Sequence, residues 1–136
     1  MTSYPYSAES PGGVPSLICD VTIAPAHDPR DAELCRAVVD TGSELSAVPE
    51  RFLRSRSIPP AGHQDVTVAD GRTITVALFP VEVRLPGWQP ISILAGTVPF
   101  DTFLIGLDIL EHGILLADGP SARFSLISGA GVLDYC

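Results

Sequence analysis

The stretch that decides the fold is residues 37–43, with the sequence AVVDTGS. Its three apolar residues are typical of a buried strand, and the Asp40-Thr41-Gly42 that follows is turn-forming sequence. A carboxylate at the end of a buried strand lies in a partly dry setting, where its protonation responds to its surroundings. Gly42 permits close approach of the backbone, and Ser43 offers a hydroxyl to an ionised neighbour. Asp40 is therefore a candidate catalytic residue, and a turn-capping role is the alternative.

Short strand-like runs separated by turns surround this stretch. With 13 prolines and 12 glycines among 136 residues, the chain has no room for long helices. Apolar or alternating runs predict strands, and two further short runs, the first with Pro49 at its start, predict helices. The expected strands cover 16–23, 34–39, 66–68, 74–78, 81–85, 91–95, 103–106, 114–117 and 122–127, and the expected helices cover 48–54 and 107–112. The predicted fold class is all-β with one or two short helices.

The sequence around residues 69–72 predicts a β-hairpin. Alternating apolar residues lie on both sides of Ala69, Asp70, Gly71 and Arg72. An Asp-Gly pair between two such runs is a strong local turn signal. These residues form a turn whether or not they cover a binding site, so a purely structural role is the alternative.

Composition narrows the classes of function. The net charge is −8, and the sequence pI is about 4.6. An acidic surface repels phosphate backbones, so no nucleic-acid partner is expected. No apolar run approaches the length of a membrane span, and no segment resembles a secretion signal. We therefore expect a cytoplasmic protein without a membrane partner.

The cysteines and histidines form no recognisable metal motif. Cys19, Cys35 and Cys136 are not spaced like metal ligands, and their odd number favours a reducing compartment. Glu111 and His112 are adjacent, but no third ligand stands at a supporting spacing. No metal and no cofactor are expected.

These features together resemble the retropepsin-type aspartic proteases, a single-domain, retroviral-like family, over residues 17–127. Three elements match in order: the Asp-Thr-Gly-Ser of residues 40–43, the hairpin 68–72 at the place of the family's flap, and the Leu-Ile-Gly of residues 104–106. Retroviral enzymes usually carry an arginine after this glycine, where this chain has Leu107. The resemblance implies a single-lobe, closed barrel-like acid-protease fold with a flap hairpin.

The resemblance also implies a homodimer, because the chemistry needs two carboxylates and the chain has one Asp-Thr-Gly. Two carboxylates held this close share one proton. The ionised member activates a water, and the protonated member donates to the scissile carbonyl oxygen. A symmetric partner is expected to supply the second Asp40. The implied activity is that of an aspartic endopeptidase acting on extended polypeptide.

Roles for the neighbouring residues follow from the same resemblance. Thr41 is expected to lock the two active-site loops across the dimer axis, and Gly42 to accept a hydrogen bond from the substrate backbone. Ser43 is expected to hydrogen-bond the Asp40 carboxylate.

The remaining site residues are expected below and above the substrate. Ile105 and Gly106 are expected to support the active-site loop from beneath. Residues 69–72 are expected to close over an extended peptide, which lies in the site like an added strand.

The domain organisation follows from these assignments. We expect a flexible N-terminal arm over 1–16, the protease domain over 17–128, and a C-terminal tail or dimer-interface segment over 129–136. The expected partners are a second copy of the chain and a polypeptide substrate, and the chain's own N-terminal arm is one candidate substrate. The rival interpretation is a dimeric interaction module with this fold and weak or no catalysis.

Overall fold

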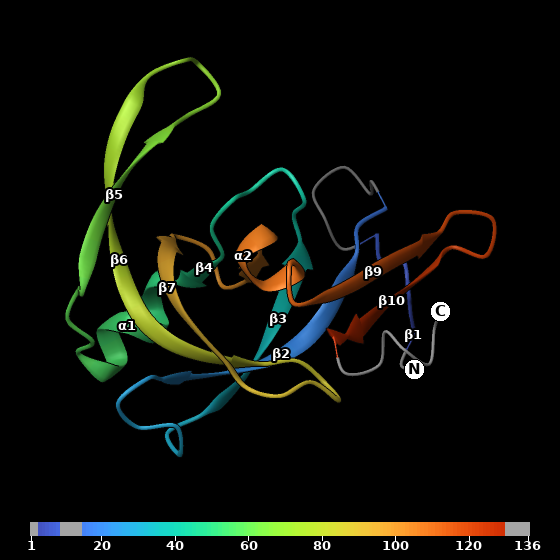
Figure 1. Cartoon of the computed structure of the whole chain (residues 1–136), viewed down its shortest axis with the longest axis horizontal. Helices are drawn as coiled ribbons and strands as arrows, with labels where there is room; N and C mark the ends of the chain where they lie inside the picture. Colours follow the sequence, from blue (N-terminus) through green and yellow to red (C-terminus); the bar gives the residue numbers. More distant parts are fainter. Residues whose placement is uncertain (1–2, 9–14, 130–136) are drawn as a thin grey trace.

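The computed structural model describes residues 3–8 and 15–129, which form two β-sheets and two short helices (Figure 1). Within these residues the chain has ten strands, and no helix is longer than the seven residues of α1. The mostly β class that the sequence predicts is confirmed. The homodimer stays a prediction.

The larger sheet closes on itself. Its strand order is β2-β3-β8-β4-β7-β6-β5, and β2 also pairs with β6, so the wall formed by the first six strands is continuous. Beyond this wall, β5 pairs with the first half of β6, and the two strands rise from the barrel as a hairpin (Figure 1). The bounds are β2 (Ile18–Pro25), β3 (Glu33–Val39), β4 (Ala47–Pro49), β5 (Gly62–Thr67), β6 (Thr73–Arg84), β7 (Ile91–Val98) and β8 (Phe103–Ile105).

The barrel core is built by alternation along the strands. In β2, Cys19, Val21 and Ile23 are buried, whereas Asp20 between them is exposed. Successive side chains of a strand point to opposite faces, so every second residue enters the core. Each large apolar side chain buried in this way contributes about 1.5–3 kcal/mol. The largest fully buried side chains include Phe52, Phe103, Phe124, Ile105 and Ile109.

The smaller sheet joins the two ends of the described chain. Its antiparallel order is β1 (Ser3–Pro5), β10 (Arg123–Ser128) and β9 (Gly113–Asp118). Tyr4 of β1 packs against Phe124 of β10, with ring centroids 5.1 Å apart. The flexible arm expected over 1–16 is therefore wrong for residues 3–5, because these residues cover an edge of β10 and pair with it. The domain boundaries at 17–128 and 129–136 stay predictions, and residues 130–136 lie outside the described part.

The two helices are α1 (Glu50–Arg56) and α2 (Leu107–Leu110). Pro49 ends β4 and is the N-cap residue immediately before α1. Arg51 of α1 binds Glu33 at the start of β3 and Asp101 in the loop before β8, and both hydrogen bonds raise the pKa of the Arg51 guanidinium. These contacts attach α1 to two neighbouring segments of the barrel.

Besides β1, the structure departs from the expected elements at two further strands. β6 is one strand of 12 residues where the sequence predicted two, over 74–78 and 81–85. It stays continuous because β5, β7 and β2 pair with it along its length. β4 was not predicted; its three residues are all buried, so they lack an alternating pattern. No described helix has the length and apolar character needed to cross a membrane.

Candidate active site

Asp40 lies at the carboxyl end of β3, in the interior of the larger sheet. β3 runs parallel to β8, with Val39 opposite Ile105. The Asp40 backbone N–H donates to the Ile105 carbonyl oxygen at 2.9 Å, which continues the strand pairing by one residue. Ile105 is fully buried. The strand pairing therefore fixes the backbone of the candidate catalytic residue, while its half-buried side chain stays accessible.

The turn after Asp40 is closed by hydrogen bonds to this residue. The Gly42 N–H donates to the Asp40 carboxylate at 3.1 Å, and the Ser43 N–H donates to the Asp40 carbonyl oxygen at 3.2 Å. The Ser43 hydroxyl donates to the Leu45 carbonyl oxygen at 2.6 Å rather than to the Asp40 carboxylate, where the sequence had placed it. Thr41 is exposed. The carboxylate is thus held by a backbone donor of its own turn.

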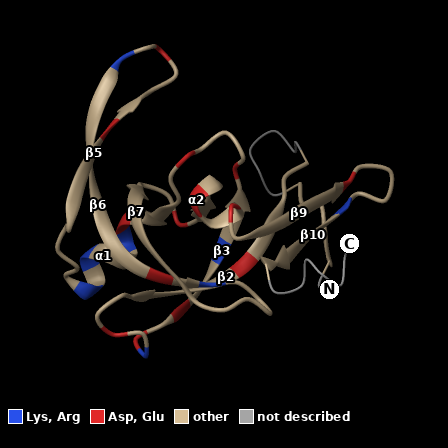
Figure 2. Cartoon of the chain, in the orientation of Figure 1, with Lys and Arg blue, Asp and Glu red and all other residues tan. Residues whose placement is uncertain are grey.

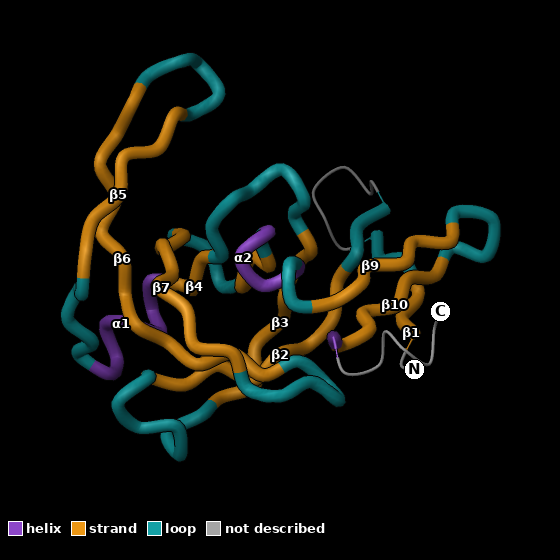
Figure 3. The backbone as a smooth tube through the Cα atoms, in the orientation of Figure 1, coloured by secondary structure: helices purple, strands orange, loops and turns teal. Residues whose placement is uncertain are grey.

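Gly106 lies against the active-site loop, residues 40–46. A Cβ atom on Gly106 would stand 2.7 Å from the Leu45 carbonyl carbon and 2.9 Å from the Ser43 carbonyl oxygen. Real Cβ atoms do not approach backbone this closely, so the loop and β8 meet here only because residue 106 has no side chain. The N–H of Leu107 then donates to the Ser43 carbonyl oxygen at 2.9 Å. The loop curves around α2, as Figure 3 shows. The role of Ile105 and Gly106 in supporting the active-site loop stays a prediction.

A buried network that the sequence did not reveal holds the far end of this loop. The Asp108 carboxylate accepts the Ser46 N–H at 3.0 Å and the Ser46 hydroxyl at 2.5 Å. The Ser46 hydroxyl oxygen in turn accepts the Gly106 N–H at 2.9 Å. Ser46 is fully buried. Asp108 and Ser46 are 62 residues apart, and no local sequence pattern marks their contact.

The predicted hairpin turn is present at the tip of β5 and β6. The N–H of Val68 donates to the Arg72 carbonyl oxygen at 2.9 Å, and the backbone of Gly71 has φ +87°. The Asp70 carboxylate accepts from both the N–H and the guanidinium of Arg72, at 3.0 and 2.6 Å. Ala69 and the three residues after it are exposed. The turn is confirmed, and its role as a flap stays a prediction.

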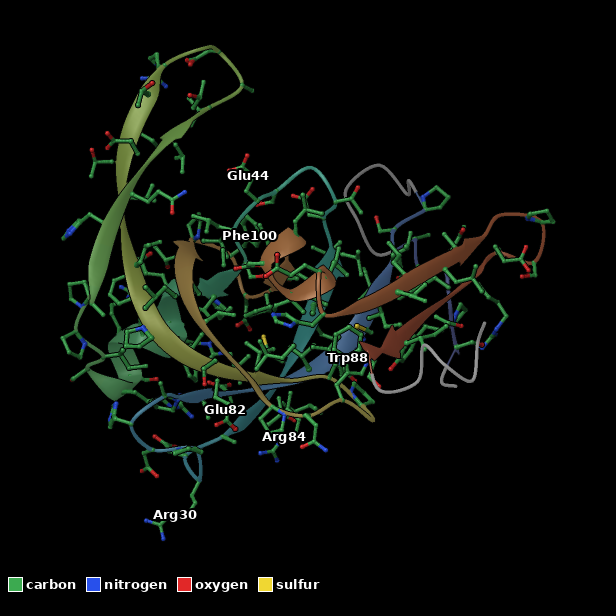
Figure 4. The ribbon with its side chains drawn as sticks, in the orientation of Figure 1. Arg30, Glu44, Glu82, Arg84, Trp88 and Phe100 are labelled. Carbon is green, nitrogen blue, oxygen red and sulfur yellow. The ribbon has the colours of Figure 1, made fainter. Side chains whose placement is uncertain are left out.

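A groove of about 650 Å³ lies between this hairpin and the active-site loop. Its walls are residues 42–47, residues 65–67 of β5, residues 76–77 of β6, and residues 96–97 of β7. The groove begins two residues after Asp40. Figure 4 shows Glu44 projecting from the loop between β3 and β4, away from α2. The Asp40 carboxylate accepts the N–H of Gly42, the first of these lining residues.

The described residues hold no group of three or more His, Cys, Asp or Glu side chains placed to bind a metal ion. The His112 Nε2 and Glu111 Oε1 atoms lie 3.7 Å apart. Cys19 and Cys35 are buried, free thiols, and burial raises the pKa of each, that of Cys19 to about 12. Cys136 lies outside the described residues.

Comparison with known proteins rests on structure. No protein-family profile matches the chain, and no curated protein matches it in sequence. A retropepsin-like aspartic protease from Rickettsia conorii is similar, with a TM-score of 0.58 and 13% identity, over 92% of this chain and 90% of that one. The foamy viral protease-reverse transcriptase has a TM-score of 0.50 and 16% identity over 73% of this chain, which spans 13% of the viral one. The retroviral protease-like domain of Ddi1 from Leishmania major has 20% identity and a TM-score of 0.46, over 80% of this chain and 87% of that one.

The first of these likenesses runs along almost the whole of both chains, and it agrees with the closed barrel and the hairpin described above. At 13% identity it establishes the fold and not the activity. The chain has the fold of the retropepsin-type aspartic proteases.

Proposed function

We propose that the chain is an aspartic endopeptidase that is active as a homodimer. The observation that carries the proposal is the position of Asp40. Its backbone N–H donates to the Ile105 carbonyl oxygen at the end of a central strand, and its carboxylate accepts the N–H of Gly42, a residue that lines the groove between the active-site loop and the β5–β6 hairpin. A groove of this kind accepts an extended peptide as an additional strand.

The proposed chemistry uses Asp40 from each of two copies. One carboxylate is ionised and takes a proton from a water that lies between the pair, and the oxygen of this water attacks the scissile carbonyl carbon. The other carboxyl is protonated and donates its proton to the carbonyl oxygen. Collapse of the resulting gem-diol breaks the C–N bond, and a proton passes to the leaving amine. A single copy lacks the second carboxyl, because the sequence has one Asp-Thr-Gly.

The surface proposed for dimer formation includes the sheet of β1, β10 and β9. Within the described residues β1 and β9 are the edge strands of this sheet, and an edge strand offers backbone groups for pairing with another chain. Leu116 of β9 and Leu107 at the start of α2 are exposed apolar side chains, 37% and 44% accessible. Burying them against a second copy removes apolar surface from water. Thr41, exposed beside Asp40, is the proposed contact across the axis.

The chain's own N-terminal arm remains a candidate substrate, with one restriction. The Tyr6 N–H donates to the Ala122 carbonyl oxygen at 2.8 Å, and Ser7 pairs with Ser16. Cleavage within residues 3–7 therefore requires β1 to detach from β10 first. Residues 9–14 lie outside the described part of the chain.

The test compares the wild-type protein with Asp40→Asn. Both are incubated with unfolded proteins and a peptide library from pH 3.5 to 7.5, the products are identified by mass spectrometry, and the oligomeric state is measured in parallel. We expect cleavage by the wild type to exceed that by the variant by at least about 10³-fold, since a group that takes part directly in the chemistry is lost. We also expect the rate to follow the dimer concentration.

Two results contradict this proposal. Equal cleavage by the two proteins assigns the activity to a contaminant or another site. A dimer that is inert with every substrate favours the rival interpretation, a non-catalytic interaction module.

A further inference from the structure

The groove beside Asp40 is acidic, and no arginine neutralises it. Its lining includes two carboxylates, Glu44 on the active-site loop and Asp65 on β5. Both are exposed, and the Asp65 carboxylate accepts a hydrogen bond from the Thr75 hydroxyl at 2.6 Å. No basic residue is among the groove residues. Figure 2 shows acidic residues and no basic ones along the loop between β3 and β4.

The basic residues of the chain are engaged elsewhere. All eight are arginines, and the sequence has no lysine. Seven of them form ion pairs in the described structure, with carboxylates outside the groove. The eighth, Arg123, donates to Ser3. Among the described residues no ion pair involves Glu44 or Asp65, so both carboxylates are available to a cation from outside the chain.

The groove lining also contains apolar side chains beside polar ones. Leu45, Val66 and Val76 line the same groove. Arg and Lys side chains combine an apolar stem with a charged end, and they pack the stem on apolar surface while the charge contacts a carboxylate. A glutamate or aspartate at the same place is repelled, and a purely apolar side chain leaves the carboxylates without a partner.

We propose that this groove selects polypeptide segments in which an Arg or Lys lies at a fixed distance from the scissile bond, with its charge between Glu44 and Asp65. This inference rests on the proposed endopeptidase function. In a twofold-symmetric dimer each copy supplies one such groove. The preference for a basic residue therefore recurs on both sides of the scissile bond, at equal spacing.

The size of the preference follows from the exposure of the carboxylates. Ion pairs between exposed groups contribute about 0.2–1 kcal/mol each, which corresponds to roughly 1.4- to 5-fold in rate or affinity. With two carboxylates facing one cation, we expect kcat/KM for an Arg-containing peptide to exceed that of its Gln analogue by about three- to tenfold. The preference is expected to weaken between 20 mM and 500 mM NaCl, because salt screens exposed charges.

The experiment uses peptides with a good cleavage sequence in which Arg, Gln or Glu is placed in turn at each of four positions on either side of the bond. Wild type, Glu44→Gln and Asp65→Asn are compared, and Glu50→Gln is the control. Glu50 is an exposed carboxylate on α1, paired with Arg54 and outside the groove, so this variant changes the net charge equally. We expect each groove variant to lose at least half of the Arg-over-Gln ratio, and Glu50→Gln to keep it.

A second measurement separates this inference from the proposed function. Binding of fluorescent Arg, Gln and Glu peptides is measured by anisotropy with Asp40→Asn protein, with and without Glu44→Gln. Cleavage without any charge preference overturns the inference and leaves the endopeptidase standing. If no peptide is cleaved, the endopeptidase proposal fails, and the binding measured by anisotropy then tests the charge preference of the groove by itself. Equal binding of the three peptides overturns the inference, and Arg-selective binding that Glu44→Gln removes supports it.

Discussion

The active-site loop, residues 40–46, and the hairpin tip, residues 68–72, lie on opposite sides of one groove and are held in different ways. The loop is bound by residues 60 or more positions away, through Ile105, Gly106 and Asp108. The hydrogen bonds described above for the tip are all local, and its residues 69–72 are exposed. Segments with few buried contacts open at low free energy. The difference indicates that the active-site loop, the floor of the groove, is fixed by distant segments, whereas the shape of the tip is set by its own turn.

Among the variants considered, the largest loss of stability is expected from Gly106→Ala, which alters the contact between the active-site loop and β8. The new Cβ meets backbone atoms of Leu45 and Ser43 at 2.7–2.9 Å, and backbone cannot move aside as a flexible side chain does. We expect a loss of about 3 kcal/mol in the free energy of unfolding, at the upper end for overpacked cores. Urea denaturation measures it. The control is Gly119→Ala, where nothing lies within 4 Å of the added Cβ, and equal stability of the two variants would contradict a tightly fitted floor.

A smaller effect is expected from Asp108→Ala, which removes the acceptor of the Ser46 N–H and hydroxyl. Ser46 is fully buried, so its donors lose a partner that water cannot easily replace. The expected cost is about 1–3 kcal/mol. Because the far end of the active-site loop is released, kcat should fall more than peptide affinity. Glu111→Ala, an exposed carboxylate one turn further on, is the control, and a loss of stability no greater than in this control would refute the anchoring role.

Alkaline pH should weaken the barrel by a still smaller amount. The pKa of the Cys19 thiol is raised to about 12, mainly by burial and further by the charge of Asp20. The unfolded chain releases this proton near the ordinary value of 9.0 and the folded chain does not, so stability is complete below pH 9 and falls as pH rises toward 12. The slope is at most about 1.4 kcal/mol per pH unit. Denaturation midpoints at pH 8, 9 and 10 measure it, and Cys19→Ala should have a shallower slope.

The thiols of Cys19 and Cys35 allow the accessibility of the barrel to be compared with that of the hairpin tip. In a Cys136→Ser background, iodoacetamide at pH 8 should label Cys19 and Cys35 slowly, because both are buried. A thiol introduced by Ala69→Cys at the exposed tip should react at the rate of the unfolded chain. Similar rates for the barrel thiols and the tip thiol would show that the barrel and the tip do not differ in accessibility.

The smallest effect is expected at the tip itself, from Gly71→Ala. Gly71 has φ +87°, a region that costs an L-residue about 1 kcal/mol, and nothing lies within 4 Å of the added Cβ. Global stability should change by no more than this amount. Gly62→Ala, at the base of the same hairpin with no contact within 4 Å, is the matched control. A loss comparable to that of Gly106→Ala would mean that the tip is as constrained as the floor.

The sequence indicated most elements of this fold because their signals are local. The apolar run ending at Asp40 predicted β3, the Asp-Gly pair predicted the hairpin turn, and Pro49 marked the start of α1. Residues 3–5 were misassigned to a flexible arm, since three polar-flanked residues have no strand pattern of their own. Their strand exists because β10 offers an edge and Phe124 offers a ring to Tyr4.

The candidate site likewise combines residues with a local sequence signal and contacts that only the fold creates. Asp40, Thr41, Gly42 and Ser43 stand in one motif that can be read from four consecutive letters. Their assigned roles stay predictions, and the hydroxyl of Ser43 donates to Leu45 instead of the expected carboxylate. The acidic groove was not anticipated, because Glu44 and Asp65 are 21 positions apart in the sequence and line one groove only in the folded chain.

The sequence by itself determined the strand-rich character, the position of the one Asp-Thr-Gly, and the hairpin turn, because neighbouring residues set each of them. The tertiary structure alone decided that β2 pairs with β6 to close the barrel, that Gly106 lies against the active-site loop, and that Ser46 and Asp108 are partners. These contacts join segments about 60 residues apart. Packing brings such segments together, and no local periodicity encodes which of them will meet.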